Sequence, residues 1–237
     1  MVGRRSLRAG APRSRRSARP RPRGPSGPPV LSLVLVPAAA TLAVTLLRLA
    51  GELLEWDPRF FSRAPGGGLA VVGIAWLVPV VGLHFGHRLA RAEQSPASLA
   101  RAAGLPLAAL VVPPILALLA PRLGLGGSAT GYLVVWAVAA VLTVIVAFAA
   151  WPALGRVLLA YAVLARVPVV AVMWAAIRGA WRTHYDAPPP GFPSVTPTLR
   201  WMWTGVLPQL TIWIAWTVAV GALFGALGWY LASRHDR

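Results

Sequence analysis

The feature that most constrains this chain is a series of long stretches without charged residues. The segments 123–155 and 201–233 contain no Asp, Glu, Lys or Arg, and each exceeds the roughly 20 residues that an α-helix needs to cross a bilayer. Apolar residues make up 57% of the chain and charged residues only 12%, whereas soluble domains carry about 25% charged residues. The composition therefore predicts an integral membrane protein.

The membrane-spanning part is expected to be an all-α helical bundle. In lipid, only helices and closed barrels satisfy every backbone hydrogen-bonding group, and the apolar residues here run continuously instead of alternating as they do in barrel strands. We expect one polytopic domain, residues 30–237, with about six transmembrane helices. Their approximate ranges are 30–49, 69–86, 105–121, 131–151, 157–177 and 206–231.

Residues 1–29 form an Arg/Pro-rich tail that we expect to be disordered and cytoplasmic. Nine of the chain's 23 basic residues precede Gly24, and no acidic residue balances them, so the segment has too little apolar surface to fold. Its charge suits anionic lipid headgroups and a cytoplasmic retention signal. The same charge would attract the phosphates of nucleic acid, but the sequence favours the lipid interpretation.

The distribution of arginines predicts the orientation in the membrane. With the amino terminus inside, the cytoplasmic segments hold 15 arginines and the external segments hold seven, which agrees with the usual excess of positive charge on cytoplasmic loops. The tail carries this inference, since the other segments hold six against seven. We interpret the chain as a multi-pass protein of a bacterial cytoplasmic (inner) membrane with both termini in the cytoplasm.

Two pairs of glycines are candidates for helix contacts. Gly82 and Gly86 form a GxxxG pair in the second predicted span, and Gly221 and Gly225 form another in the sixth. Small residues at this spacing let two helix backbones approach closely. The chain has 23 glycines, so chance occurrence is the alternative to a contact face for each pair.

Arg166 is the most informative polar residue, because it interrupts the fifth predicted span and an arginine at that depth normally faces protein or water. Pro113 and Pro114 lie near the middle of the third span, and their missing N–H groups leave carbonyls of the preceding turn unpaired. We expect Arg166 to bond those carbonyls as a structural staple, to snorkel, or to form an anion or substrate site beside the broken helix. Thr143 and Gln209 complete this candidate intramembrane site.

A second candidate site combines two loops on the predicted outer side of the membrane. Its members are Glu52, Glu55, Asp57, Arg178, Arg182, His184 and Asp186. Carboxylates that face arginines and a histidine can bind a polar headgroup, a cation or a proton. The alternative is a set of ion pairs between the two loops at the water boundary, each contributing less than about 1 kcal/mol, and the sequence favours this alternative.

No cofactor or metal is expected from the sequence. His84 and His87 lie three residues apart and so share one face of a helix, but two histidines need further ligands to hold a metal or haem. The chain has no cysteine, and it contains no phosphate-binding loop, nucleophile elbow or HExxH motif. We interpret the two histidines as an interfacial pair without a metal.

Three functional classes remain open at this point. The sequence favours a non-catalytic membrane component that binds a protein or lipid partner, or a second copy of itself, because no catalytic constellation is present. A small transporter or channel would need the polar residues around Arg166 to line a wet path. A membrane enzyme would need Glu52 or Glu55 to meet His184 in a pocket.

Overall fold

The computed structural model describes residues 28–68, 70–124 and 129–235, so nearly all of the predicted tail lies outside the described residues. The described residues form an all-α fold with six long helices, as expected. These are α1 (Val30–Leu53), α2 (Leu77–Arg91), α3 (Leu99–Leu119), α4 (Ala129–Ala150), α5 (Pro152–Gly179) and α8 (Ile212–His235). The shorter elements are η1 (Pro65–Gly67), η2 (Ala120–Leu123), α6 (Pro197–Trp201), η3 (Met202–Val206) and α7 (Leu207–Leu210).

Three helical segments are long and apolar enough to cross a membrane: Val30–Leu53, Pro152–Gly179 and the joined segment Pro197–Arg234. The apolar parts of α3 and α4 are shorter, Leu99–Pro113 and Val134–Ala150. The 15 residues of α2 extend only about 22 Å at 1.5 Å per residue, less than the ~30 Å hydrocarbon core. By helix composition, the chain is a multi-pass membrane protein.

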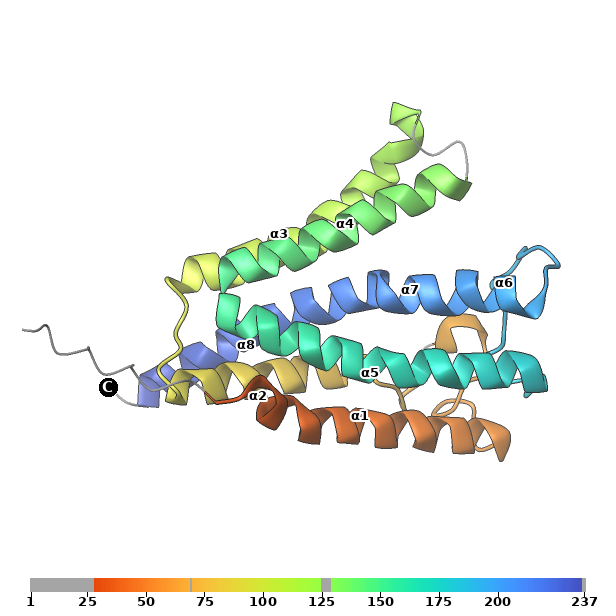
Figure 1. The fold of residues 1–237 in the computed structure, drawn as a ribbon, viewed down its shortest axis with the longest axis horizontal. Coiled ribbons are helices and arrows are strands. Elements are labelled where there is room, and N and C mark those ends of the chain that lie inside the picture. Colours follow the sequence, from red (N-terminus) through yellow and green to blue (C-terminus); the bar gives the residue numbers. More distant parts are fainter. Residues whose placement is uncertain (1–27, 69, 125–128, 236–237) are drawn as a thin grey trace, which may run out of the picture.

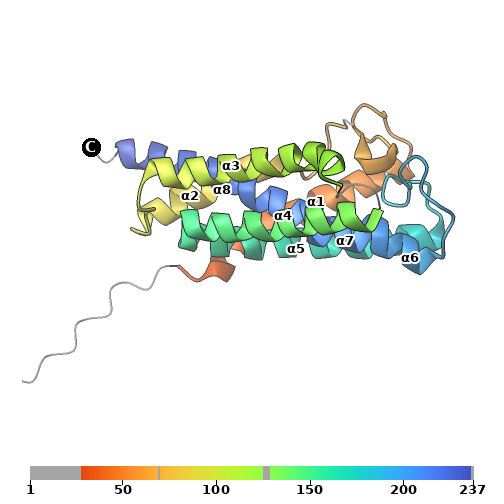
Figure 2. The same ribbon diagram turned by 90° about the horizontal axis from the view of Figure 1, so that it is seen from above.

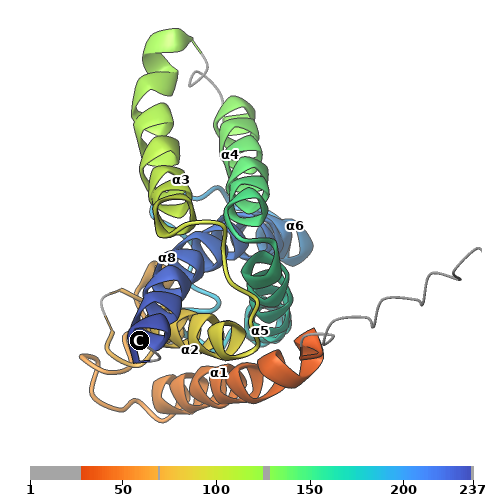
Figure 3. The same ribbon diagram turned by 90° about the vertical axis from the view of Figure 1, so that its left-hand side faces the viewer.

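Consecutive long helices run in opposite directions along the molecule (Figure 1). The described ends of the chain, residues 28 and 235, therefore lie toward the same end, which we call the terminal end. The segments 54–76 and 180–196 lie together at the opposite end, which we call the loop end (Figure 2). Figure 3 shows α1, α2, α5 and α8 grouped together, while the α3–α4 hairpin extends away from α1.

The most extensive helix contact joins α2 and α8 through the two glycine pairs. A methyl group added at Gly82 would lie 2.5 Å from the carbonyl oxygen of Gly221, and one added at Gly86 would overlap the carbonyl oxygen of Gly225. The two backbones therefore touch with no side chain between them, which glycine alone permits at these positions. The contact-face interpretation is confirmed for both pairs, and the two faces meet each other.

The second long helix begins at Leu77, eight residues later than the predicted span 69–86. The chain before it is irregular and has positive φ angles at the three consecutive glycines 66–68, a conformation that glycine adopts without a steric penalty. Arg48 holds this segment by donating to three of its backbone carbonyls at 2.8 to 3.0 Å. Irregular backbone is stable at membrane depth only where such partners satisfy it.

The last span is not one regular helix. It begins with α6, continues through the π-helical turn η3 and α7, and kinks at Thr211, where φ is −116° and ψ is −79°. Pro208 contributes to the break because it has no N–H group to donate to the preceding turn. The sequence places the main helix break at Pro113 and Pro114, whereas α3 is continuous from Leu99 to Leu119.

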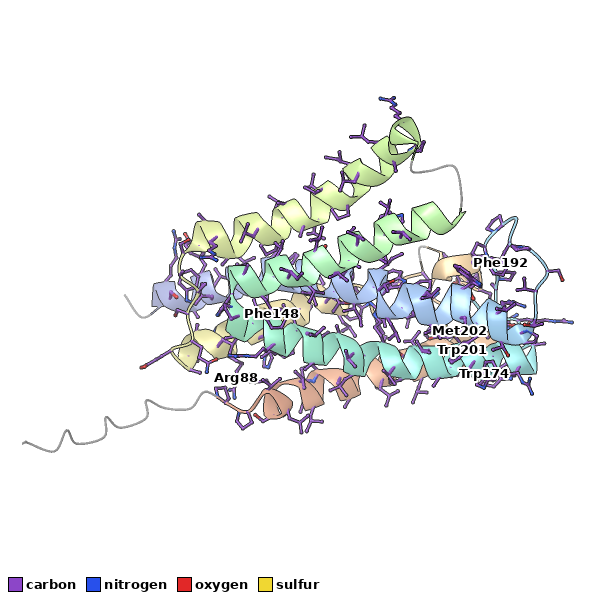
Figure 4. All side chains as sticks on the ribbon, turned by 45° about the horizontal axis from the view of Figure 1, so that its top comes forward. Arg88, Phe148, Trp174, Phe192, Trp201 and Met202 are labelled. Atoms are coloured by element: carbon purple, nitrogen blue, oxygen red, sulfur yellow. The ribbon has the colours of Figure 1, made fainter. Side chains whose placement is uncertain are left out.

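The main apolar core joins α1, α2, α4, α5 and α8. Its largest fully buried side chains are Tyr161, Phe85, Leu89, Leu154 and Leu158. Figure 4 shows Arg88 at the terminal end, and Trp174 and Trp201 at the loop end, where their ring centres lie 5.0 Å apart. Tryptophan commonly occupies the boundary between lipid and water, so this placement fits a loop end that lies at such a boundary.

Candidate functional site

The described residues form a cavity of about 620 Å³ between the loop end and the middle of the bundle. Its walls come from α1, the irregular chain before α2, α5, the loop 180–196 and the kinked start of the last span. The polar side chains that line it are Thr45, Arg48, Arg166, His184, Tyr185, Thr204 and Gln209. No Asp or Glu is among the lining residues, so the wall carries positive charge without negative charge.

Arg166 lies at the deep end of the cavity, with only 3% of its surface exposed. Its Nη1 donates to Gln209 Oε1 at 3.2 Å, and its Nη2 donates to Thr217 Oγ1 at 3.3 Å. The guanidinium carbon lies 4.8 Å from the centre of the Trp213 ring, and Nε has no hydrogen-bond partner among the described residues. All of these partners are neutral, so within the described chain no carboxylate pairs with this buried cation.

The depth of Arg166 follows from its position near the middle of the 28-residue helix α5, about 20 Å from either helix end. On the side of the terminal end, the Tyr161 hydroxyl and Thr41 Oγ1 share a buried hydrogen bond of 2.8 Å. The Tyr161 ring also packs edge-on against Phe85. None of these three residues lines the cavity, whose wall toward the loop end includes exposed loop residues such as Pro189.

Glu52, near the end of α1, organises the upper part of the cavity. Its side chain is 0% exposed and accepts from Arg48 Nε at 2.8 Å. It also accepts from the backbone N–H of His184 at 2.8 Å and contacts His184 Nδ1 at 2.5 Å. An ionised carboxylate only accepts hydrogen bonds, so Nδ1 is the nitrogen that carries the proton and donates. The two loops of the predicted outer cluster therefore meet through Glu52 and His184.

Arg48 makes four hydrogen bonds within the protein with its five N–H groups, whereas Arg166 makes two. Besides its ion pair with the Glu52 carboxylate, it uses both terminal nitrogens on backbone carbonyls of the irregular chain before α2. These acceptors are Val72 at 2.9 Å, Ser62 at 3.0 Å and Gly67 at 2.8 Å. Arg48 thus fixes the shape of the cavity wall, and Arg166 is the cation with more N–H groups left for a ligand.

The second ring nitrogen of His184, Nε2, has no hydrogen-bond partner among the described residues, and the side chain lines the cavity. Burial lowers the pKa of His184 below its ordinary value of 6.5; the bond to Glu52 opposes this shift and the charge of Arg48 adds to it. The ring is therefore neutral at neutral pH. Because the unfolded chain binds this proton more readily, His184 contributes stability above pH 6.5 that is lost as the pH falls.

Asp186 holds the loop between α5 and α6 in shape. Its Oδ1 accepts from the N–H and hydroxyl of Thr183 at 2.6 and 2.8 Å, and its Oδ2 accepts from the N–H of Arg182 at 3.0 Å. Tyr185 ties the same loop to α1 by donating to the Thr45 carbonyl at 3.2 Å. Burial raises the pKa of the Tyr185 hydroxyl, so this group remains a neutral donor.

Four other members of the predicted outer cluster lie on the exposed surface. These are Glu55, Asp57, Arg178 and Arg182. Glu55 pairs with Arg63 at 3.1 Å, and Asp57 pairs with Arg59 at 2.7 Å. The hydrogen bond from Arg59 lowers the pKa of Asp57. Both pairs lie within the segment 54–76, whereas the expected pairs joined the two loops. The contact that does join the loops is the buried one between Glu52 and His184.

Pro113 and Thr143 line a second cavity, of about 220 Å³, between α3, α4 and α8. Arg166 is not among its lining residues, and its hydrogen bonds go to the last span instead of the carbonyls that precede Pro113 and Pro114. The reason is the arrangement of helices: α3 packs mainly against α4 and α8. Of the predicted intramembrane set, only Gln209 contacts Arg166.

His84 and His87 lie in α2 and follow Gly82 in the sequence. The residues of this segment that line the cavity come before α2, at 66–76. His84 is exposed and its ring lies 5.9 Å from that of Phe85. Within the described ranges, no group of three or more His, Cys, Asp or Glu side chains is placed to hold a metal ion. The two histidines thus have no third metal ligand in that part of the chain.

Sequence reasoning missed three residues that shape the site: Arg48, Trp213 and Thr217. A spacing of four residues indicates each of them in the sequence, because residues four apart lie on one face of a helix. Arg48 and Glu52 have this spacing in α1. Gln209, Trp213 and Thr217 repeat it twice in the last span, and all three contact Arg166.

Comparison of the chain with protein-family models, curated proteins and solved structures finds no match. The function is therefore argued from the geometry of the cavity. That geometry combines a buried cation with neutral partners, a histidine oriented by a buried carboxylate, and an apolar wall between them. Such an arrangement is suited to holding an anion in a partly apolar environment.

Proposed function

We propose that the protein is a ligand-binding component of a bacterial cytoplasmic membrane, and that its ligand is a small organic anion held beside Arg166. The chain crosses the membrane six times, with the irregular chain before α2 completing the second crossing; both termini lie in the cytoplasm, and the loop end faces the outside. The observation that carries the proposal is the buried Arg166 guanidinium, whose partners are all neutral. The proposed role is therefore binding without catalysis, and the bound partner is a small anion.

Burial of the Arg166 guanidinium carries a cost in free energy. A guanidinium removed from water without a counter-charge costs several kcal/mol, and the face of Trp213 offsets only part of this. An anion in the cavity beside the Arg166 guanidinium would supply charge-assisted hydrogen bonds and remove the imbalance. Arg48 does not compete for this role, because its charge is already paired with Glu52.

The remaining cavity wall indicates that the ligand has an apolar body. Apolar lining side chains include Val44, Ile74, Val169, Met173, Phe192 and Trp203. The volume of about 620 Å³ falls within the roughly 300–1,000 Å³ typical of small-molecule sites. Carboxylates, sulfonates and phosphate monoesters with a small apolar group share the required chemistry, whether free in solution or part of a lipid headgroup.

Transport is the second candidate role, and the kinked start of the last span supports it. Gln209 precedes the kink at Thr211 and Thr217 follows it, so Arg166 bonds both sides of the break. Broken helices beside a site near the middle of the membrane are typical of transporters. Uptake of the ligand into proteoliposomes would distinguish a carrier from a receptor.

The variant Arg166→Gln is expected to weaken binding of benzenesulfonate at least about tenfold, because it removes the charge that pairs with the sulfonate. Isothermal titration of the full-length protein in phosphatidylcholine nanodiscs measures this affinity. Arg166→Lys keeps the charge and should retain part of the binding. The neutral analogue benzenesulfonamide should bind more weakly than benzenesulfonate to the unmodified protein.

The matched control is Arg156→Gln, on the exposed surface of the same helix, which should bind benzenesulfonate like the unmodified protein. Nanodiscs that also contain phosphatidylglycerol distinguish the two ligand sources, since a lipid headgroup in the cavity would compete with the probe. Equal binding of benzenesulfonate and benzenesulfonamide, or undiminished binding by Arg166→Gln, would contradict the proposal.

The orientation can be tested in the native background, because the chain contains no cysteine. Ser194 lies in the loop before α6 and Ala97 in the loop between α2 and α3, and both are exposed. We expect Ser194→Cys to react with a membrane-impermeant maleimide in intact spheroplasts, and Ala97→Cys to react only after the membrane is permeabilised. The reverse pattern would place the loop end in the cytoplasm.

A further inference from the structure

We propose that anion binding in this cavity is coupled to the uptake of one proton by His184, so that the two ligands bind together. The inference rests on the proposed anion-binding function and adds its regulation by pH. It is supported by the orientation of the imidazole ring, by the charges that surround the ring, and by its separation from Arg166.

The first observation is that the ring orientation of His184 is fixed. Glu52 accepts from both the backbone N–H and Nδ1 of this residue, and Arg48 holds Glu52 in turn. The ring cannot rotate without losing its bond to a buried carboxylate. A proton therefore adds at Nε2, the nitrogen without a partner among the described residues, and turns a neutral group in the cavity wall into a cation.

The second observation is the balance of charges around His184. The charged groups that act on it are Glu52 and Arg48 from α1 and Asp186 from its own loop. The Tyr185 ring lies against it, Arg166 of α5 lines the same cavity, and Arg63 donates to the Glu52 carbonyl. The last span contributes only neutral residues to the cavity lining. The charge of Arg48 opposes protonation of His184. We infer that Arg166 opposes it as well in the empty cavity, because it lines the same cavity and no carboxylate pairs with it.

An anion bound at Arg166 reverses this balance. It neutralises the arginine and presents its own body toward the loop end, where His184 lies. Protonation of Nε2 then becomes more favourable, and the two events stabilise each other by the same factor, as linkage requires. The affinity for the anion therefore rises as the pH falls through the range in which His184 takes up its proton.

The third observation, the separation of the two groups, sets the size of the effect. Tyr161 of α5 bonds Thr41 of α1, and the two helices run in the same direction (Figure 1), so Arg166 is level with residue 46 of α1. Glu52, which holds His184, lies about 9 Å farther toward the loop end. At this distance and an effective dielectric constant of about 20, the attraction between unit charges corresponds to an affinity change on the order of tenfold.

The test is isothermal titration of benzenesulfonate into the full-length protein in phosphatidylcholine nanodiscs at about pH 8 and about pH 5.5, on either side of the ordinary histidine pKa. The sulfonate keeps its charge over this range, so any pH dependence belongs to the protein. We expect tighter binding at the lower pH, approaching a factor of roughly ten as the pH falls below the pKa of His184 in the empty cavity. Titrations in buffers of different ionisation enthalpy should report proton uptake by the complex.

The variant His184→Gln should bring the ratio of the two affinities to about one, whereas His84→Gln, at an exposed position on α2, should keep the ratio of the unmodified protein. Binding that is equal at both pH values, without proton uptake, would overturn the coupling and leave the anion site standing. No binding at either pH would overturn the anion site itself. Even if His184→Gln does not fold, the number of protons that the unmodified protein takes up when it binds benzenesulfonate still tests the coupling.

Discussion

Replacing Gly86 by leucine is expected to separate α2 from α8 and to lower the melting temperature of the protein on the order of 10 °C. The added Cβ would overlap the carbonyl oxygen of Gly225, so the backbones themselves would have to move apart. Overpacking typically costs about 1–3 kcal/mol, and a backbone contact cannot be relieved by a change of rotamer. Close packing is also a main source of helix association in lipid. Tryptophan fluorescence of the purified protein in detergent, followed on heating, measures the shift.

The matched control for this prediction is Gly104→Leu. Gly104 lies in helix α3 with nothing within 4 Å of its added methyl group, so the same substitution meets open space. Leucine also has a higher helix propensity than glycine, by up to about 1 kcal/mol. An unchanged melting temperature for Gly86→Leu, or equal destabilisation by both variants, would contradict the assigned glycine contact.

The variant Glu52→Leu is expected to destabilise the fold by about 3–5 kcal/mol, the usual cost of removing one partner from a buried ion pair. Arg48 is only 8% exposed and would keep its charge without a carboxylate beside it. The loop that carries His184 would also lose two hydrogen bonds. Thermal denaturation measures the loss, and limited proteolysis should show earlier cleavage within the loop 180–196.

The matched control for Glu52→Leu is Glu55→Gln. Glu55 lies three residues farther along, its side chain is 76% exposed, and it pairs only with Arg63 at the surface. Its substitution should leave the melting temperature unchanged within error, since exposed pairs contribute little. If the two variants behave alike, Glu52 does not have the structural role that its burial indicates.

Much of the helical architecture could be predicted because it depends on local patterns. Long apolar stretches indicate six helices, and the spacing of Gly82 and Gly86 indicates a contact face without knowledge of its partner. The side-by-side position of Glu52 and His184 could be anticipated from the alternation of helix direction, which brings their two loops to one end. Each of these inferences needs only chain direction and helix periodicity.

The partners of Arg166 could not be predicted, because depth in the membrane does not specify which helix is the neighbour. Pro113 and Arg166 were expected at a similar depth, yet α3 packs mainly against α4 and α8. The late start of α2 was missed for a related reason. Residues 69–76, before α2, are apolar enough to belong to a span. Arg48 nevertheless stabilises an irregular conformation of this part of the chain through long-range hydrogen bonds, and hydropathy does not detect such bonds.

The hairpin of α3 and α4 contributes no residue to the larger cavity. Its position has a practical consequence for imaging, because a 25.0 kDa membrane protein gives too little signal for particle alignment by electron cryomicroscopy on its own. A rigid fiducial domain fused between these two helices would add mass at a site remote from the ligand chemistry. The cavity could then be imaged with a bound anion, and none of the residues that line it would have to be changed.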